Sequence, residues 1–420
     1  MPQPETGTLL EHLFRHQAGR MTGHLTRLLG SARLDLAEEI VQEAMLRALQ
    51  TWPYQGVPEN PQAWLFRTAR NAAMDVVRHE SMAERKLASV SGGTVFAKNS
   101  DAMNWDPGPL DDEVQDDELR MIFMCCHPEI PRDSSVALSL KTAGGFSVRE
   151  IARAFLTEEA TIAQRLVRAK RQIRERGLSF DLPRGAELQQ RLTAVLEVLY
   201  FVFNEGYTAH EGEDLVRRDL CFEALRLAGL IASSSSAEPR VHALVAVMAF
   251  QSARLPARVD ALGDLVLLED QDHSLWDRHL IDLGFHHFNL SIHGDEVSEY
   301  HVQAAIASLH VQEAPDWGAI LRLYDQLWEM NASPVVALNR AVAVAKVRGP
   351  AEALSAIEPL IANPTLREYY LLLAVRGHLL LELGRREEAA ACYQAALDCR
   401  CSEPERRLLR RKLLECGVTM

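Results

Sequence analysis

The side chains best suited to a chemistry of their own lie between Val148 and Glu175. A cationic and amide set covers the outer faces of a helix predicted there: Gln164, Arg165, Arg168, Lys170, Arg171 and Arg174. Arginine can pair with both acceptors of guanine in the DNA major groove, and glutamine with the donor and acceptor of adenine. Ile162, Leu166 and Ala169 follow the opposite side as a buried stripe. An ordinary solvated amphipathic helix has the same pattern, so the pattern alone permits either structure.

The residues that precede this helix favour DNA binding. Ile151, Ala152 and Phe155 mark a short helix, and residues 156–159 form a tight turn. A short helix, a turn and a second helix make a helix-turn-helix, whose second helix enters the major groove. Leu156 stands where many such turns have glycine.

A second candidate is the sequence Cys125-Cys126-His127-Pro128. Zinc requires about four ligands, and no CxxC pair accompanies this one, although Cys221, Cys392, Cys399 and Cys401 are unassigned. Core packing is therefore favoured over a redox or metal role. The segment NEGY at 204–207 is predicted to be a helix end with a glycine cap and a structural role.

Five histidines form a third candidate between residues 273 and 293. The set is His273, His279, His286, His287 and His293. His279, His286 and His293 are spaced by seven residues, which predicts that these three share one side of a helix. A metal-dependent enzyme could use such a row, but no carboxylate motif such as HExxH accompanies it. A solvated row is favoured over a ligand set.

The composition predicts an almost entirely helical protein. In 420 residues, 47% are hydrophobic, 25% charged and only 6% aromatic, and alternating runs of β-branched residues are scarce. A chain of this length predicts two to four domains. Seven cysteines, no hydrophobic leader and no apolar run near ~20 residues predict a soluble, reduced, cytoplasmic protein without a membrane segment.

The net charge of −13 is unevenly distributed. Residues 1–180 hold 22 Lys and Arg against 24 Asp and Glu, and the remainder holds 23 against 34. Eight of the N-terminal acids lie in Asp101–Glu118, which has no basic residue. A DNA-binding N-terminal half and an acidic C-terminal half are compatible with this distribution.

The pattern from Leu9 to about Ser81 predicts helices throughout. One broad buried face is predicted from Leu36, Ile40, Ala44, Ala48, Val41, Met45 and Leu49, and Glu38, Glu39, Gln42, Glu43 and Arg47 face away. Glu39 and Glu43 are predicted to project from the face opposite Leu46 and Leu49. Prolines at 53 and 58 end that helix, and Asn60 caps the next, which is predicted to end near Arg78. Residues 88–112 are predicted to be a flexible acidic linker.

The C-terminal part shows internal repetition. Small and aromatic residues recur at positions typical of tetratricopeptide helix pairs: Gly377, Gly384, Ala389, Tyr393 and Ala396, and upstream Ala341, Gly349, Ala353, Ile357 and Leu360. Such pairs stack into a helical array with concave binding surfaces.

Several of these stretches together resemble a known family, the extracytoplasmic-function sigma factors of bacterial RNA polymerase. Asp35–Trp52 resembles sigma region 2.2, Pro61–Glu80 resembles regions 2.3 and 2.4, and Val148–Glu175 resembles region 4.2. Residues 199–207, 274–281 and 333–345 resemble the subgroup with a tetratricopeptide-like C-terminal extension. The resemblance covers nearly the whole chain.

The resemblance implies three functional surfaces. Docking on the β′ clamp of core polymerase falls to Asp35, Glu38, Glu39, Gln42 and Glu43. Contacts with the −10 element, read as single-stranded DNA, fall to Trp64, Arg67, Arg70, Asn71, Asp75, Arg78 and His79, although Trp64 could equally be a core residue. Contacts with the −35 element fall to Thr161, Gln164, Arg165, Arg168, Lys170 and Arg171.

The domains expected on this basis are region 2 over 1–87, the linker over 88–112, region 4 over 113–178 and a tetratricopeptide-like domain over 185–420. The implied function is a sigma factor that binds core RNA polymerase at the β′ clamp and β flap, recognises both promoter elements and is regulated in cis by its C-terminal domain, which would also bind a regulatory protein. It implies no catalysis, no cofactor and no metal. The alternative is a standalone helix-turn-helix regulator with a protein-binding repeat domain.

Overall fold

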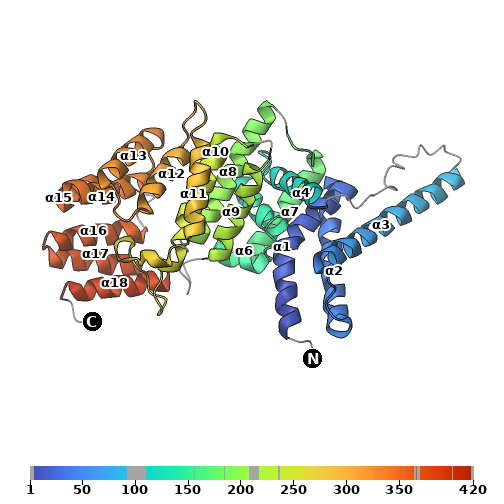
Figure 1. Ribbon diagram of the computed structural model, residues 1–420, viewed down its shortest axis with the longest axis horizontal. Coiled ribbons are helices and arrows are strands. Elements are labelled where there is room, and N and C mark those ends of the chain that lie inside the picture. Colours follow the sequence, from blue (N-terminus) through green and yellow to red (C-terminus); the bar gives the residue numbers. More distant parts are fainter. Residues whose placement is uncertain are drawn as a thin grey trace. The chain divides into compact units, whose positions relative to one another are not determined.

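Helices form the described part of the chain, as predicted. The computed structural model describes residues 4–91, 110–155, 157–183, 185–207, 217–234, 237–363, 366, 369–399 and 401–417. Within these ranges β-type pairing is limited to isolated bridges such as Val259–Leu265. The chain divides into two units, residues 1–198 and 199–420, at a point inside helix α8 (Ala186–Tyr207) (Figure 1). None of the helices in these ranges is both long and apolar enough to cross a membrane.

The first unit begins with three helices: α1 (Pro4–Leu29), α2 (Leu34–Gln55) and α3 (Pro61–Ser91). Their shared core is built from small and branched apolar side chains, among them Met21, Leu25, Ile40, Val41, Ala44, Met45, Ala48, Trp52, Leu65 and Ala69. Gly56 ends α2 with a φ of 84°, a backbone conformation that favours glycine. The Oδ1 atom of Asn60 accepts a hydrogen bond of 2.9 Å from the Ala63 amide, which confirms the predicted cap.

Three details of these helices differ from the sequence prediction. Leu49 is 48% exposed and Leu46 is 55% exposed, so Leu49 is not a core residue. Residues 39 and 46 are seven apart and therefore on the same side of α2, so Glu39 does not lie opposite Leu46. Helix α3 also continues past Arg78 to Ser91, because residues 81–90 contain good helix formers and the first breaker is Gly92.

Four further helices complete the helix-turn-helix part of this unit: α4 (Leu110–Cys125), α5 (Arg132–Thr142), α6 (Val148–Ala154) and α7 (Glu159–Arg176). Ser147 and Glu150 form a capping box that begins α6, and Gly177 ends α7 in the left-handed conformation. Ile162, Leu166, Ala169 and Ile173 are buried, which confirms the predicted stripe. Leu156 and most of the predicted linker, residues 92–109, lie outside the described residues; residues 88–91 and 110–112 are helical.

Helix α1 packs tightly against α4 and the end of α5. A Cβ atom at Gly19 would lie 2.1 Å from the Ala143 carbonyl oxygen, and one at Gly23 would lie 2.8 Å from the backbone carbonyl oxygen of Asp117. The fully buried Asp117 carboxylate is bound by His24 at 3.1 Å, Arg27 at 2.9 Å and Arg120 at 2.8 Å. A buried carboxylate is stable only with such partners, so this cluster ties the first three helices to the helix-turn-helix part.

The second unit is a succession of antiparallel helix pairs. Its helices after α8 are α9 (Arg218–Ala232), α10 (Pro239–Ala253), α11 (Arg278–Ser291), α12 (Glu299–His310), α13 (Trp317–Met330), α14 (Pro334–Arg348), α15 (Pro350–Ile357), α16 (Tyr370–Glu382), α17 (Arg386–Asp398) and α18 (Glu403–Glu415). Neighbours in sequence pack on one another, as α13–α15 and α16–α18 show in Figure 1. A long irregular segment, residues 254–277, separates α10 from α11.

The repeat positions have the packing roles that their residue types predict. Ala353 and Ala389 are fully buried, and Gly349 and Gly384 have φ values of 91° and 74° at the turns between paired helices. A Cβ atom at Gly377 would lie 3.0 Å from the Tyr393 ring, so this glycine lets α16 and α17 approach closely.

Candidate functional site

The outer face of α7 is cationic and polar. Gln164, Arg168 and Arg171 are exposed, and Thr161 and Arg165 are half-buried. Arg165 forms an ion pair with Asp133 at 3.1 Å, and Arg171 lies 3.6 Å from Glu175. Gln164, Arg168 and Arg171 lie away from the buried stripe, on the side that a groove-reading helix presents to DNA, whereas Arg165 lies beside the stripe.

The predicted −10 residues form a polar stripe along α3. Arg67, Asn71, Asp75 and Arg78 are exposed and follow one another at helical spacing, and His79 is exposed beside them. Arg78 and Asp75 are 3.5 Å apart, a weak surface pair that a phosphate could displace. Arg70 is half-buried.

Trp64 lies at the edge of this stripe and belongs partly to the core. Its ring packs edge-on against Trp52 with centroids 5.5 Å apart, and it is half-buried against the α1–α3 core. The structure therefore supports a packing role for Trp64.

The outer face of α2 combines acids with exposed leucines. Asp35, Glu39, Gln42 and Glu43 are exposed, and Glu43 pairs with Arg47 at 2.6 Å. Leu46 and Leu49 extend the same face. Sequence reasoning counted Leu49 as core and missed this mixed surface; the spacing of residues 39, 42, 46 and 49 was the signal that could have shown it.

One predicted −35 residue contacts two of the predicted polymerase-docking residues. The Nζ atom of Lys170 on α7 donates hydrogen bonds to Asp35 at 2.8 Å and to Glu38 at 2.7 Å on α2. The side chains of Lys170 and Glu38 are only 17% and 13% exposed, whereas that of Asp35 is 63% exposed. Burial works against the charged amine, but Glu38 and Asp35 outweigh it and raise the pKa of Lys170 above its usual value.

The two adjacent cysteines lie in a packed interior. Cys125 and Cys126 are buried, with their sulfur atoms 3.0 Å from the Thr142 hydroxyl and 3.4 Å from the Ser139 hydroxyl. Burial raises the pKa of both thiols, that of Cys126 to about 12, so neither is a reactive thiolate. This environment supports the predicted packing role.

The histidine row is only partly formed. His279 and His286 lie on α11, but His293 lies beyond its end at Ser291, so the three do not share one helix. His287 instead stacks on His242 of α10, with their Nδ1 atoms 2.9 Å apart. Across the described ranges, no group of three or more His, Cys, Asp or Glu side chains is placed to hold a metal ion.

The NEGY segment does not end in a glycine cap. Gly206 lies within α8, where a Cβ atom would be 2.8 Å from the Leu220 Cβ and 2.9 Å from the Arg217 oxygen. The absence of a side chain lets α8 and α9 approach, which is the structural role in a different form.

A helix-turn-helix with a cationic outer helix, joined to a three-helix unit with an exposed polar stripe, defines a DNA-binding protein of transcription. Comparisons with known proteins specify the class: residues 13–82 match sigma-70 region 2, residues 120–173 match sigma-70 region 4, and residues 191–292 match a family of unknown function (DUF6596). An uncharacterized protein of Rhizobium meliloti (strain 1021) is 40% identical over 385 residues, 90% of each chain. No solved structure matches the chain. The chain belongs to the sigma-70 family, as a sigma factor of the extracytoplasmic-function type with a helical C-terminal extension.

Proposed function

We propose that this sigma factor binds core RNA polymerase through the outer face of α2 and directs it to promoters whose −10 and −35 elements it contacts with α3 and α7. The face of α2 formed by Asp35, Glu38, Glu39, Gln42, Glu43, Leu46 and Leu49 would dock on the β′ clamp. On docking, the exposed leucines would become the water-free centre of the interface and the surrounding acids its charged rim, the usual anatomy of a protein interface. Region 4 would contact the β flap.

The −10 and −35 contacts follow from exposure and charge. The stripe Arg67, Asn71, Asp75, Arg78 and His79 offers cations for phosphates and polar groups for the edges of unstacked bases. On α7 the exposed Arg168 and Gln164 are suited to base edges in the duplex major groove.

The observation that carries the proposal is that one unit combines a helix-turn-helix with the exposed surfaces of α2 and α3. A standalone regulator uses a helix-turn-helix but has no use for the exposed polar stripe of α3 or the leucine-containing face of α2. The match of residues 13–82 to sigma-70 region 2 supports the same choice.

The C-terminal helical unit would regulate the factor in cis and bind a regulatory protein. Stacked helix pairs present concave surfaces suited to such partners. We expect the factor to act in the cytoplasm, where its polymerase is.

In vitro transcription tests the proposal. Full-length protein added to core polymerase should give promoter-specific transcripts. A variant with Leu46→Asp and Leu49→Asp should lose core binding while keeping its helical content, because both side chains are exposed and contribute little to the fold. The matched control is Val57→Asp, an exposed apolar residue just beyond the end of α2, which should bind normally. Sequence-specific DNA binding without any association with core polymerase would favour the standalone regulator instead.

A further inference from the structure

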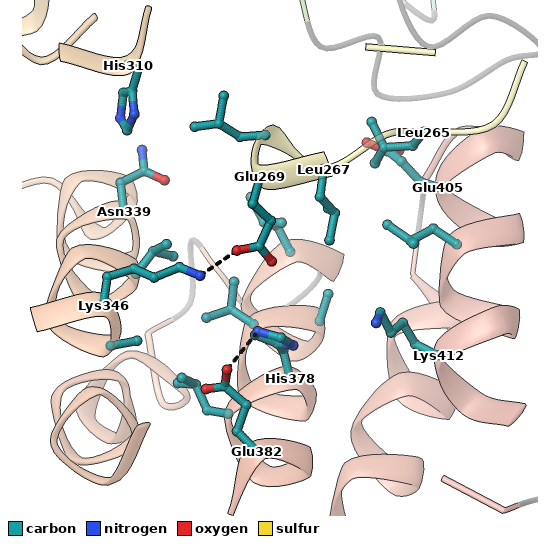
Figure 2. Close-up of a pocket in the computed structure, with 18 of the residues that line it drawn as sticks. Leu265, Leu267, Glu269, His310, Asn339, Lys346, His378, Glu382, Glu405 and Lys412 are labelled. Atoms are coloured by element: carbon teal, nitrogen blue, oxygen red, sulfur yellow. Dashed lines mark hydrogen bonds and ion pairs between the residues drawn. The ribbon is translucent and has the colours of Figure 1, made fainter. Parts of the chain in front are cut away.

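The second unit contains a cavity of about 610 Å³. Its walls are the helices α14, α16 and α18, and the irregular segment at Leu265–Glu269 crosses above them (Figure 2). Pockets for small organic molecules usually occupy 300–1,000 Å³. All of its lining residues lie between 265 and 412, within one compact unit.

The segment above the cavity is held by charges on the helices. Lys346 of α14 donates to Glu269 at 2.5 Å, and Arg407 of α18 binds Asp264 and donates to the Gly263 carbonyl oxygen at 2.9 Å. These bonds keep Leu265 and Leu267 over the cavity, where Figure 2 shows them between α14 and α18. The segment that contributes Leu265, Leu267 and Glu269 to the lining is therefore anchored to both α14 and α18.

Most of the lining surface is apolar, and aliphatic side chains are its largest class. It includes Leu265, Leu267, Val342, Leu371, Val375 and Leu408. An apolar surface of this kind contributes binding free energy in proportion to the area that a ligand removes from water.

Most of the charged groups that line the cavity are paired within the protein; Glu313, which also lines it, is exposed. Glu269 pairs with Lys346, Glu382 lies 3.6 Å from His378, and Lys412 pairs with Glu415 at 3.0 Å. Tyr370 donates its hydroxyl hydrogen to Glu405. An ionised ligand would have to break such a pair, at a cost in free energy that a neutral ligand does not meet.

Among the residues that the structure describes, two buried side-chain polar atoms of the lining have no hydrogen-bond partner. They are the Tyr393 hydroxyl, on a side chain that is 1% exposed, and the Nδ1 atom of His310. Burial, with the nearby Arg254 charge, lowers the pKa of His310 to about 4, so its ring is neutral at pH 7. A buried polar atom without a partner costs free energy, and a ligand hydroxyl or carbonyl would satisfy it.

We propose that this cavity binds a neutral, largely aliphatic small molecule that carries a hydroxyl or carbonyl group. Such a ligand would bury its chain against the leucines and valines and direct its polar group to Tyr393 or His310. If the proposed function holds, the C-terminal unit would then respond to a small molecule as well as to a protein.

A fluorescent probe tests the binding without polymerase or DNA, so its outcome is independent of the proposed function. The uncharged dye N-phenyl-1-naphthylamine, titrated into the full-length protein, should give saturable fluorescence with one site. We expect 1-decanol to displace it, and decanoate at pH 7.5 to be weaker by about tenfold or more because its carboxylate is desolvated. Equal or better displacement by decanoate would overturn the proposal, and so would displacement by a leucine-rich peptide but not by decanol.

Variants locate the site. Val375→Phe and Val342→Phe fill the cavity from two different walls and should each weaken dye binding by about tenfold or more, since the ring occupies the ligand's volume. Val335→Phe makes the same change at an exposed position outside the cavity and should bind as wild type. Tyr393→Phe should retain the melting temperature and weaken decanol binding by about two- to tenfold. Wild-type dye and decanol binding in the folded Val342→Phe or Val375→Phe protein would place any binding elsewhere and overturn the proposal.

Discussion

The Lys170 bridge predicts that a single truncation in region 4 strengthens binding to core polymerase. Lys170 pairs with Asp35 and Glu38, two of the residues proposed to dock on the clamp. While the bridge is closed, both carboxylates are paired with Lys170, and Glu38 is largely buried. Lys170→Ala should therefore favour the open form in which the α2 face is available.

The size of the effect follows from burial. A hydrogen bond to a charged group contributes about 1.5–3 kcal/mol, and an exposed ion pair contributes less than about 1 kcal/mol. Glu38 is largely buried and Asp35 is exposed, so the bridge is worth about 1.5 kcal/mol after screening. That free energy corresponds to about a tenfold change in the closed-to-open ratio. If the closed form dominates, the affinity for core should rise by up to about tenfold.

The assay is the affinity of full-length protein for labelled core polymerase, measured without DNA. Arg171→Ala is the matched control, because Arg171 is the adjacent cation and pairs with Glu175 on the same helix. Hydrogen exchange gives a readout that does not depend on polymerase: amides of α2 and α7 should exchange faster in Lys170→Ala than in Arg171→Ala. Unchanged or weaker core binding by Lys170→Ala, with unchanged exchange, would refute the reasoning.

Three further predictions concern other parts of the molecule. Arg168→Ala should weaken promoter DNA binding by about 1–3 kcal/mol and relax the base preference at one −35 position, measured on a set of promoter variants. An equal loss of affinity for all promoter variants would instead make α7 an electrostatic anchor only. Gly206→Ala should destabilise the protein by about 1–3 kcal/mol in urea, since its Cβ meets backbone atoms of α9; Gly229→Ala, a helical glycine with nothing within 4 Å, should be neutral or stabilising, and equal effects of the two would contradict the packing argument. Because the pKa of His310 is lowered to about 4 in the folded protein, the unfolded chain binds more protons between pH 6.5 and 4, and stability should fall as pH falls through this window. The loss of stability on acidification should be smaller in His310→Asn than in the wild-type protein, by at most about 3 kcal/mol at pH 4. Identical melting curves for wild type and His310→Asn from pH 7 to 4 would exclude this role of His310.

The helices that carry the site were predictable because their signals are local. The stripe Ile162, Leu166 and Ala169 is buried as its spacing requires, and Asn60 caps α3 through its own side chain. The repeat glycines were equally visible, since Gly384 and Gly349 stand at turns that need a positive φ. The apolar residues of α2 lie on more than one side, and Leu46 and Leu49 are on the exposed one. The prediction that Leu49 is buried with the other apolar residues was therefore wrong. A docking face uses the same residue types as a core.

The features that the sequence did not predict join residues far apart in the chain. Lys170 meets Asp35 across 135 positions, and Arg407 meets Asp264 across 143. No periodicity in either segment specifies such a pair, because a lysine on a DNA-binding helix and an acid on a docking helix are each explained by their own surface. Yet the bridge joins the two proposed surfaces, so that the proposed contacts with polymerase and with DNA would draw on the same lysine and carboxylates. A partner that binds Asp35 and Glu38 would release Lys170 for phosphate, and DNA that binds Lys170 would release the two acids. By linkage, each event should therefore favour the other by the same free energy that the bridge contributes.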